Sequence, residues 1–298
     1  MFRRFLASSA AVVLVSGALL VSSVTTAGAD MASVNSAVTA TYNAADAALV
    51  PAALRHVTWQ IATDATYAPD ESMSGNTMVG FDVNLMKAVA QTLGVNIVEH
   101  NVTFDNIIAG IQSGKYLVGN SSFTDTKARE KQVNFVDYFQ AGEGVYVKSS
   151  ATWKFTGLKS FCGESVAVET GTVEQTDAKA VMCSGGKMVN VKDYPTQTEA
   201  NTAVSSGRVV AGFADSQIAG YIASTSHGVF RLAGSAVNVA PYGIATPKTA
   251  QGLALAKAIA AAMKTLVAKG TYGSILSSYG VQAGALTAAK MVLNGATA

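Results

Sequence analysis

The stretch FDVNLMKAVAQTLGVNIVEHNVTFDNIIAGIQSGKYLVGN, residues 81–120, decides the fold class. Its first part places apolar side chains from Leu85 to Leu93 at helical spacing and ends at Gly94, which predicts a helix. A strand-like run, a short helix with isoleucines on one face, and a second strand-like run follow up to residue 120. This alternation of helices and strands predicts an α/β fold with a largely parallel sheet.

The same alternation continues on both sides of this stretch. A strand at 57–63 precedes it and ends in a polar loop that contains Pro69. The second half of the chain repeats the pattern, with strands predicted over 164–171, 188–194 and 208–215 and helices over 172–182, 195–207, 216–224 and 250–270. Two α/β units of this kind predict two lobes that face each other.

The composition limits the possible function classes. The chain has 298 residues, of which 49% are apolar and only 13% are charged, about half the usual charged share. This excludes a disordered chain. Without the first 29 residues, which hold two arginines and no acid, 19 basic residues would balance 19 acidic ones. A neutral chain without a basic cluster lacks the electrostatic footprint of a nucleic-acid-binding protein.

The first 29 residues have the pattern of a secretory signal peptide. Arg3 and Arg4 precede an apolar stretch over 5–21, and Ala27-Gly28-Ala29 forms an A-x-A cleavage signal. The alternative is an uncleaved membrane anchor, since the apolar run is marginally long enough to span a bilayer when its serines are counted. Either way, the sequence predicts export to the periplasm or to the extracellular face of the cell membrane.

The two cysteines, Cys162 and Cys183, both follow this signal. In an oxidising compartment an even number of cysteines predicts a disulfide bond, here closing a loop of about 20 residues. The competing interpretation is a catalytic thiol, which requires a histidine partner. The three histidines form no motif with either cysteine, so the disulfide is favoured.

The common enzyme signatures are missing from the sequence. GIQSGKY resembles a phosphate-binding loop, but Gly110 and Gly114 are too close together and Tyr116 stands where Ser or Thr is required. There is no HExxH, GxSxG or CxxC pattern. The sequence therefore predicts no metal, no cofactor and no catalytic residue, although an enzyme of unrecognised type stays open.

Polar residues do gather where predicted strands end. The run SSFTDTKARE contains Ser122, Thr124 and Arg129, and an arginine can hold a carboxylate through two parallel hydrogen bonds. Thr172 lies at a helix start, where free N–H groups favour negative charge, and Asp215 ends another strand. Together these side chains suit a small zwitterion.

The alternative for Arg129 is structural. An arginine on a solvated helix face commonly pairs with a nearby acid, and Asp125 and Glu130 are both close in sequence.

An ordered set of motifs gives the chain a resemblance to a known family. ATDATYAPDE, GFDVNLMKAVAQTLG, FDNIIAGIQSGKY, SSFTDTKAREKQVNF, VAVETGT, YPTQTEA and GFADSQIAGY follow one another over about residues 57–280. This order resembles the amino-acid-binding proteins of ABC transporters, the bacterial extracellular solute-binding proteins of family 3. Each motif is weak alone, and the set is specific because of its order.

The resemblance implies roles at the backbone end of an amino-acid ligand. The family's arginine that holds the ligand α-carboxylate falls on Arg129, seven residues after Ser122. Thr124 and Thr172 match the positions that assist it, and Asp215 matches the acid that binds the α-ammonium group.

Further positions correspond to the ligand side chain. Tyr67 and Phe104 match the aromatic residues that sandwich it, and Asp64 matches the contact at its far end. Glu169 can approach the same region, and two acids near one side chain favour a cation because an unpaired buried carboxylate is costly. We therefore expect arginine, lysine or ornithine, followed by glutamine. Asp70 departs from the family, where an aromatic residue often follows the proline.

The resemblance implies a two-lobed periplasmic-binding-protein-like fold of type II, with two crossing strands as the hinge. The expected divisions are a signal peptide over 1–29, an N-terminal extension over 30–56, lobe 1 over 57–146 and 241–298, and lobe 2 over 147–240. The implied protein is a monomer that delivers an amino acid to a membrane permease. A ligand-sensing receptor subunit and a dehydratase-like enzyme on the same fold are the alternatives.

Overall fold

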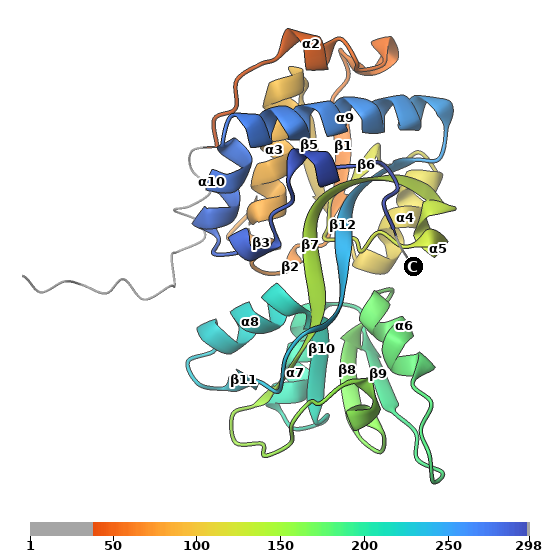
Figure 1. The fold of residues 1–298 in the computed structure, drawn as a ribbon, viewed down its shortest axis with the longest axis vertical. Coiled ribbons are helices and arrows are strands. Elements are labelled where there is room, and N and C mark those ends of the chain that lie inside the picture. Colours follow the sequence, from red (N-terminus) through yellow and green to blue (C-terminus); the bar gives the residue numbers. More distant parts are fainter. Residues whose placement is uncertain (1–37, 297–298) are drawn as a thin grey trace, which may run out of the picture.

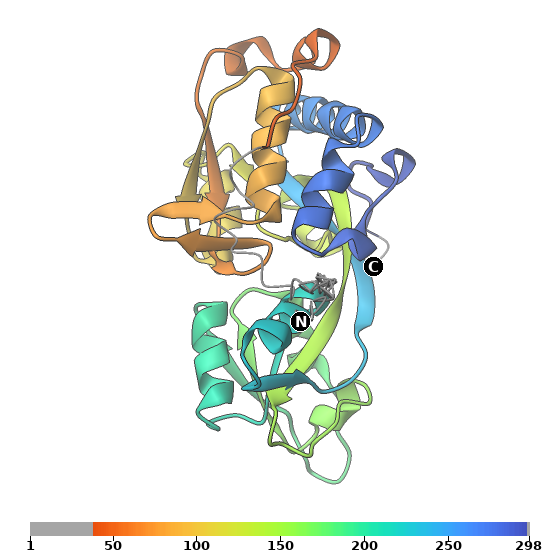
Figure 2. The same cartoon turned by 90° about the vertical axis from the view of Figure 1, so that its left-hand side faces the viewer.

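The computed structural model describes residues 38–296, so the predicted signal peptide lies outside the described residues. Two lobes lie one above the other, and two long strands, β7 (Val133–Lys148) and β12 (Val237–Pro247), run side by side between them (Figure 1). The view turned by a quarter shows both strands along one side of the molecule (Figure 2). The predicted two-lobed α/β fold is confirmed, while the predicted lobe boundaries stay a prediction.

Lobe 1 is the upper part of the molecule in Figure 1. Its helices are α2 (Ala44–Ala47), α3 (Phe81–Leu93), α4 (Phe104–Gln112), α5 (Lys127–Glu130), α9 (Ala250–Ala268) and α10 (Thr271–Ser278), with short 3₁₀ helices η2 (Ala52–Leu54), η4 (Gln282–Gly284) and η5 (Ala288–Lys290). Its strands are β1 (Trp59–Thr63), β2 (Thr66–Tyr67), β3 (Glu71–Ser74), β4 (Thr77–Val79), β5 (Ile97–Asn101) and β6 (Val118–Gly119).

Lobe 2 is the lower part of the same view. It contains η3 (Leu158–Phe161), β8 (Ser165–Glu169), α6 (Val173–Ala180), β9 (Asn190–Tyr194), α7 (Gln197–Ser205), β10 (Ala211–Asp215), α8 (Ser216–Thr225) and β11 (Phe230–Leu232).

One hydrogen-bonded sheet passes through both lobes, in the strand order β5-β1-β6-β12-β7-β10-β8-β9. In lobe 1, β1 is parallel to β5 and β6. In lobe 2, β8 is parallel to β9 and β10. Strands β7 and β12 pair antiparallel at the centre. Strands β8 and β10 end at Glu169 and Asp215, and Asp64 follows the end of β1, so these strand ends meet at one pocket.

The helix predicted first follows its sequence signals closely. Helix α3 ends at Gly94, whose φ of +66° is the left-handed conformation that favours glycine at a helix end. Its apolar side chains, including Leu85 and Leu93, are buried against α9 and α10. Helix α9 is long and apolar enough to cross a membrane by length and composition. It packs on α3, β7 and β12 instead, as a core helix does.

Two segments differ from the expectation. The polar stretch after β1, expected to be a loop, forms a small antiparallel sheet of β2, β3 and β4, because tight turns pair its short extended pieces. The arginine of SSFTDTKARE lies on a helix of only four residues, α5. The chain then enters the sixteen-residue strand β7, which is buried over nearly its whole length.

The described part of the N-terminal extension is packed onto lobe 1. Asn43 caps α2 through its side chain, and its amide N–H donates to Thr92 of α3 at 2.9 Å. The buried Asp46 accepts a hydrogen bond from the Thr265 hydroxyl of α9 at 2.6 Å. The extension therefore contributes to the outer helical layer of the lobe.

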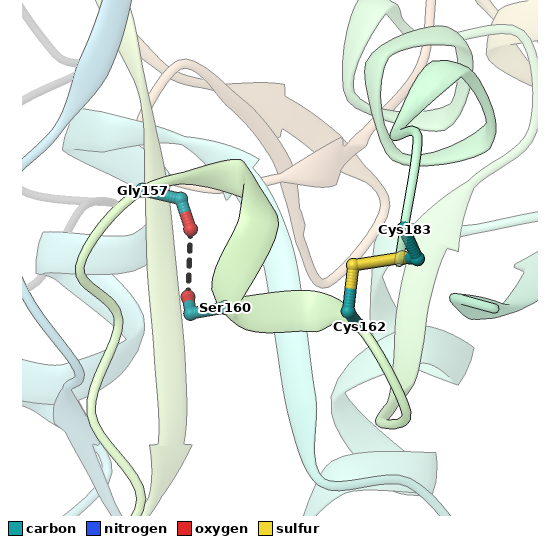
Figure 3. The surroundings of a disulfide bond; sticks show 4 residues. All are labelled: Gly157, Ser160, Cys162 and Cys183. Atoms are coloured by element: carbon teal, nitrogen blue, oxygen red, sulfur yellow. Dashed lines mark hydrogen bonds between the residues drawn. A yellow bond between two sulfur atoms is a disulfide. The ribbon is translucent and has the colours of Figure 1, made fainter. Parts of the chain in front are cut away.

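The predicted disulfide between Cys162 and Cys183 is confirmed, and it closes a sequence separation of 21 residues. Figure 3 shows the bond joining the end of η3 to the segment after α6, beside a turn in which the Ser160 hydroxyl donates to Gly157 O at 2.7 Å. This segment of lobe 2 leaves apolar side chains in solvent, since Met182 and Met188 are 84% and 77% exposed. The covalent bond therefore restrains a segment that packing holds only weakly.

We expect replacement of both cysteines by serine to lower the free energy of unfolding by about 3 kcal/mol, because the loop constraint on the unfolded chain is lost. Urea denaturation measures this change. Reduction of the wild-type protein should produce the same decrease, and the same reductant should have no effect on the double-serine variant. An unchanged unfolding midpoint in the variant would contradict the expectation.

Candidate functional site

A narrow cavity lies between the two lobes. Residues from both lobes and from several strand ends meet there. Every ligand-contact residue predicted from the sequence borders this cavity: Asp64, Tyr67, Phe104, Ser122, Thr124, Arg129, Glu169, Thr172 and Asp215. The fold thus brings together side chains that are spread over about half of the chain.

Two hydrogen bonds and two aromatic rings hold the Arg129 side chain. Its Nη1 donates to Thr124 O at 2.8 Å and its Nη2 donates to Gly171 O of lobe 2 at 2.9 Å. The guanidinium carbon lies 5.3 Å and 5.5 Å from the ring centroids of Phe104 and Phe123. These two rings stack on each other at 4.5 Å. Five N–H donors are available on a guanidinium group, so donors remain for an anion in the cavity.

The alternative of a solvated ion pair for Arg129 is contradicted. Among residues 38–296, no carboxylate lies within 4.0 Å of its guanidinium group, and Glu130 pairs with Lys127 at 3.0 Å instead. Burial lowers the pKa of Arg129 from its ordinary value, although arginine remains charged in proteins. A buried cation without an anionic partner is suited to bind an anionic ligand group.

The Ser122 hydroxyl does not point freely into the cavity. It donates to Asp70 Oδ2 at 2.9 Å, while the Ser122 amide N–H donates to Asp82 Oδ2 at 2.9 Å. Ser122 has a φ of +48°, an uncommon conformation for a residue with a side chain, and these two acceptors hold it there. The single hydroxyl hydrogen predicted to reach a ligand is engaged with Asp70 in this arrangement.

A buried cluster of Asp70, Glu71 and Asp82 lies beneath this loop. The Ser121 hydroxyl donates to Glu71 at 2.8 Å and the Tyr138 hydroxyl donates to Asp82 at 2.7 Å. Burial raises the pKa of all three carboxyl groups, that of Asp82 to about 6, and mutual repulsion adds to the effect at Asp70 and Glu71. The acids thus act as acceptors that fix the loop carrying Ser122 and Thr124.

Thr172 has the predicted position at a helix start. It is the N-cap of α6, and its hydroxyl accepts from the amide N–H of Gln175 at 3.2 Å. The same hydroxyl donates to Glu169 O at 2.8 Å. Thr172 therefore fixes the turn between β8 and α6, and Gly171 in this turn is the residue that accepts from Arg129.

Asp215 ends β10 and borders the cavity from lobe 2. Its Oδ2 accepts from the Tyr67 hydroxyl of lobe 1 at 2.8 Å, and the Asp215 amide N–H donates to the same hydroxyl at 3.1 Å. Burial raises the pKa of Asp215 to about 6, against hydrogen bonds and the charge of Arg129, which favour the carboxylate. An ammonium group beside Asp215 would favour ionisation further.

At the other end of the cavity, Asp64 and Glu169 approach each other from different lobes. Asp64 Oδ1 accepts from the Thr66 hydroxyl at 2.7 Å, and its Oδ2 accepts from the amide N–H of Phe104 at 2.9 Å. Glu169 is 1% exposed, and its Oε1 has no hydrogen-bond partner among the described residues. Burial raises the pKa of Glu169 well above its ordinary value, and the nearby Asp64 raises it further.

Further hydrogen bonds join the lobes around the cavity. The Gln217 side chain of α8 donates to Asp70 Oδ2 of lobe 1 at 2.7 Å and to the Tyr242 hydroxyl of β12 at 2.6 Å. The Gln197 amide N–H of α7 donates to the Thr66 hydroxyl at 3.3 Å. Asp70, which the sequence comparison marked as a departure, therefore lies in a contact between lobes.

Sequence reasoning missed three residues of the cavity wall: Glu71, Ser121 and Glu174. Ser121 precedes the predicted contact Ser122, and Glu71 follows Asp70, so their position next to these residues in the sequence is the signal that could have identified them. Glu174 follows Thr172 by two positions, where an acid ordinarily stabilises the first turn of a helix. Its burial, at 1% exposure, becomes evident only in the folded chain.

No group of three or more His, Cys, Asp or Glu side chains in the described residues is placed to hold a metal ion.

The fold and the cavity define a class of two-lobed solute-binding proteins that hold a small polar molecule between their lobes. The family model for bacterial extracellular solute-binding proteins, family 3, matches residues 59–282. This chain belongs to that family.

Individual relatives agree with this placement. The chain is 30% identical over 220 residues to the arginine-binding protein ArgT of Corynebacterium glutamicum, covering 72% of this chain and 70% of the relative. It is similar to an ancestral arginine-binding protein, solved with arginine and with glutamine, at 32% identity and a TM-score of 0.69, covering 75% of this chain and 98% of that one. It is also similar to an ancestral amino-acid-binding protein titled a precursor of cyclohexadienyl dehydratase, at 28% identity and a TM-score of 0.66, covering 74% and 94%.

We expect Gln217→Ala to favour opening of the two lobes, because the variant loses the hydrogen bond from α8 to the buried Asp70. Small-angle X-ray scattering in the absence of amino acids should show a larger radius of gyration than that of the wild type. Gln60→Ala is the control, since Gln60 bonds to His100 within lobe 1 at 2.7 Å. Equal radii for Gln217→Ala and the wild type would show that this contact does not hold the lobes together.

Proposed function

We propose that this protein is the extracytoplasmic substrate-binding component of an ABC transporter, and that it binds a basic L-amino acid, with arginine, lysine or ornithine preferred over glutamine. The observation that carries the proposal is the charge of the cavity wall. It presents one cation, Arg129, and five acids: Asp64, Glu71, Glu169, Glu174 and Asp215. A ligand with one carboxylate and two cationic groups complements this arrangement.

The proposed orientation puts the ligand α-carboxylate on Arg129. Arg129 keeps unused N–H donors, and the Thr172 turn in lobe 2 closes over the same end. The α-ammonium group then lies beside Asp215. Because the site lies between lobes, each end of the ligand would acquire partners from both of them only when the lobes close.

The ligand side chain then extends toward Asp64 and Glu169, flanked by Tyr67 and Phe104. A guanidinium or ammonium group between these two acids would pair with both of them and give Glu169 Oε1 a donor. A glutamine amide can donate there but brings no charge. This difference is the physical reason to rank arginine, lysine and ornithine first.

The remaining parts of the proposal follow from the family. Its members are extracellular solute-binding proteins, and the relative from Corynebacterium glutamicum is named for arginine binding. We infer that this chain is exported, acts as a monomer and delivers its amino acid to a membrane permease. In this role the protein binds its ligand without converting it.

We expect Arg129→Ala to weaken L-arginine binding more than tenfold, corresponding to about 2–5 kcal/mol, because the ligand carboxylate loses a buried charge-assisted partner. Isothermal titration calorimetry measures this affinity. The same titrations of the wild type should rank arginine, lysine and ornithine above glutamine.

Arg208→Ala is the matched control, since Arg208 is exposed in lobe 2 and bonds to the nearby Ser206. It should leave the arginine affinity unchanged. Undiminished affinity in Arg129→Ala would overturn the proposed orientation. Tight binding of glutamine or glutamate with none of arginine or lysine would overturn the ligand ranking.

A further inference from the structure

Two pairs of carboxyl groups border the cavity, one toward each end. Asp64 and Glu169 come from different lobes, and the negative charge of Asp64 raises the pKa of Glu169. Glu174 and Asp215 both belong to lobe 2, and the negative charge of Asp215 raises the pKa of Glu174. All four residues are buried, with exposed fractions of 2%, 1%, 1% and 6% in the order given. A hydrogen bond between two carboxyl groups requires a proton, because two carboxylates offer only acceptors.

The hydrogen bonds around each pair indicate which member is the anion. Asp64 accepts from Phe104 N–H and from Thr66, and Asp215 accepts from the Tyr67 hydroxyl. By contrast, Glu169 Oε1 and Glu174 Oε1 have no partner among the described residues. Donors stabilise the charged form of an acid, so the shared proton belongs to Glu169 in one pair and to Glu174 in the other.

The charged and titratable neighbours of Glu174 and Asp215 come from several elements. Arg129 of α5 is the cation that faces them. Glu143 of β7 adds negative charge, the Tyr67 hydroxyl donates to Asp215, and Tyr242 is a further titratable neighbour of Asp215. Burial raises the pKa of Glu174 well above its ordinary value, and repulsion from Asp215 and Glu143 raises it further.

The pair at the other end has no cation beside it in the described part of the chain. Asp215 adds negative charge near Glu169, Glu71 adds it near Asp64, and Tyr146 is a further titratable neighbour of Glu169. Both pairs therefore hold more negative charge than their surroundings neutralise.

We propose that the cleft exchanges protons for ligand cations, with Glu174 as the proton-holding residue at the backbone end and Glu169 at the side-chain end. The inference rests on the proposed function. An α-ammonium group that settles between Glu174 and Asp215 displaces the proton of that pair. A side-chain cation that settles between Asp64 and Glu169 displaces the other.

The exchange balances at each end. One O–H bond of a glutamic acid breaks and its proton passes to the solvent, while one ligand cation takes its place, so the local charge does not change. Arginine, with two cationic groups, releases up to two protons, whereas glutamine releases up to one. Because binding releases protons, affinity falls as pH decreases through the range in which the free pairs are protonated. Each proton released changes the affinity by about tenfold per pH unit.

Calorimetry in buffers of different ionisation enthalpy measures the number of protons released. At pH 6, wild-type protein titrated with L-arginine should release more protons than with L-glutamine, by about one. Glu174→Gln should lower the release for both ligands, and Glu169→Gln should lower it for arginine. Glu99→Gln is the control, because Glu99 is also a largely buried acid with its pKa raised to about 7, but lies beside Lys87 outside the cavity.

Different outcomes test the proton exchange and the amino-acid binding on which it rests. Arginine binding without proton release, or equal release for arginine and glutamine, would overturn the exchange and leave the binding function intact. Failure of every amino acid to bind would overturn both. The comparison of the two ligands on wild-type protein needs no substitution, so it decides the matter even where a glutamine variant fails to fold.

Discussion

The burial of many acids around one arginine is the constraint on which the cleft depends. In a chain that is poor in charge, five acidic side chains and Arg129 line a single cavity. Burial of a charge is costly unless it gains a partner, so each carboxyl group here either accepts several hydrogen bonds or is a candidate to hold a proton. Arg129 obtains only neutral partners, two carbonyl groups and two aromatic rings. Both kinds of side chain thus remain able to bind charge of the opposite sign.

The architecture holds these charges in place through rigid elements. Strands β8 and β10 end at residues of the cavity wall, and β7 and β12 connect the lobes through antiparallel pairing with two register shifts. Strand ends carry Asp215 and Glu169, and the buried acids Asp70, Glu71 and Asp82 fix the loop that carries Ser122. Contacts such as Tyr67 to Asp215 and Gln217 to Asp70 then depend on how closely the lobes approach each other. Ligand binding and lobe closure therefore act on the same groups.

Much of the fold could be predicted from the sequence, for reasons that differ between elements. Helix α3 has strong apolar periodicity and a terminal glycine, so its bounds were predicted within one residue. Strand β7 is buried on both faces and lacks the alternation that marks a strand, so only its hinge portion was anticipated. The short strands β2 to β4 carry too few residues to show a period.

Some residues of the candidate site could likewise be predicted from the sequence, and others could not. The residues near Arg129 were predicted from the order of the motifs, because proteins that share a fold keep the same order of motifs along the chain. Glu174 was missed because an acid in the first turn of a helix is usually solvated, and its burial depends on the packing of α6 in lobe 2. The engagement of the Ser122 hydroxyl by Asp70 could not be foreseen either, since it depends on a contact between segments 52 residues apart.

A crystal structure of the protein with L-arginine would test the central claim most directly. The expected structure has the ligand carboxylate on Arg129, the α-ammonium group beside Asp215, and the guanidinium group between Asp64 and Glu169. An arginine bound in the reverse direction, or outside the cavity between the lobes, would contradict it.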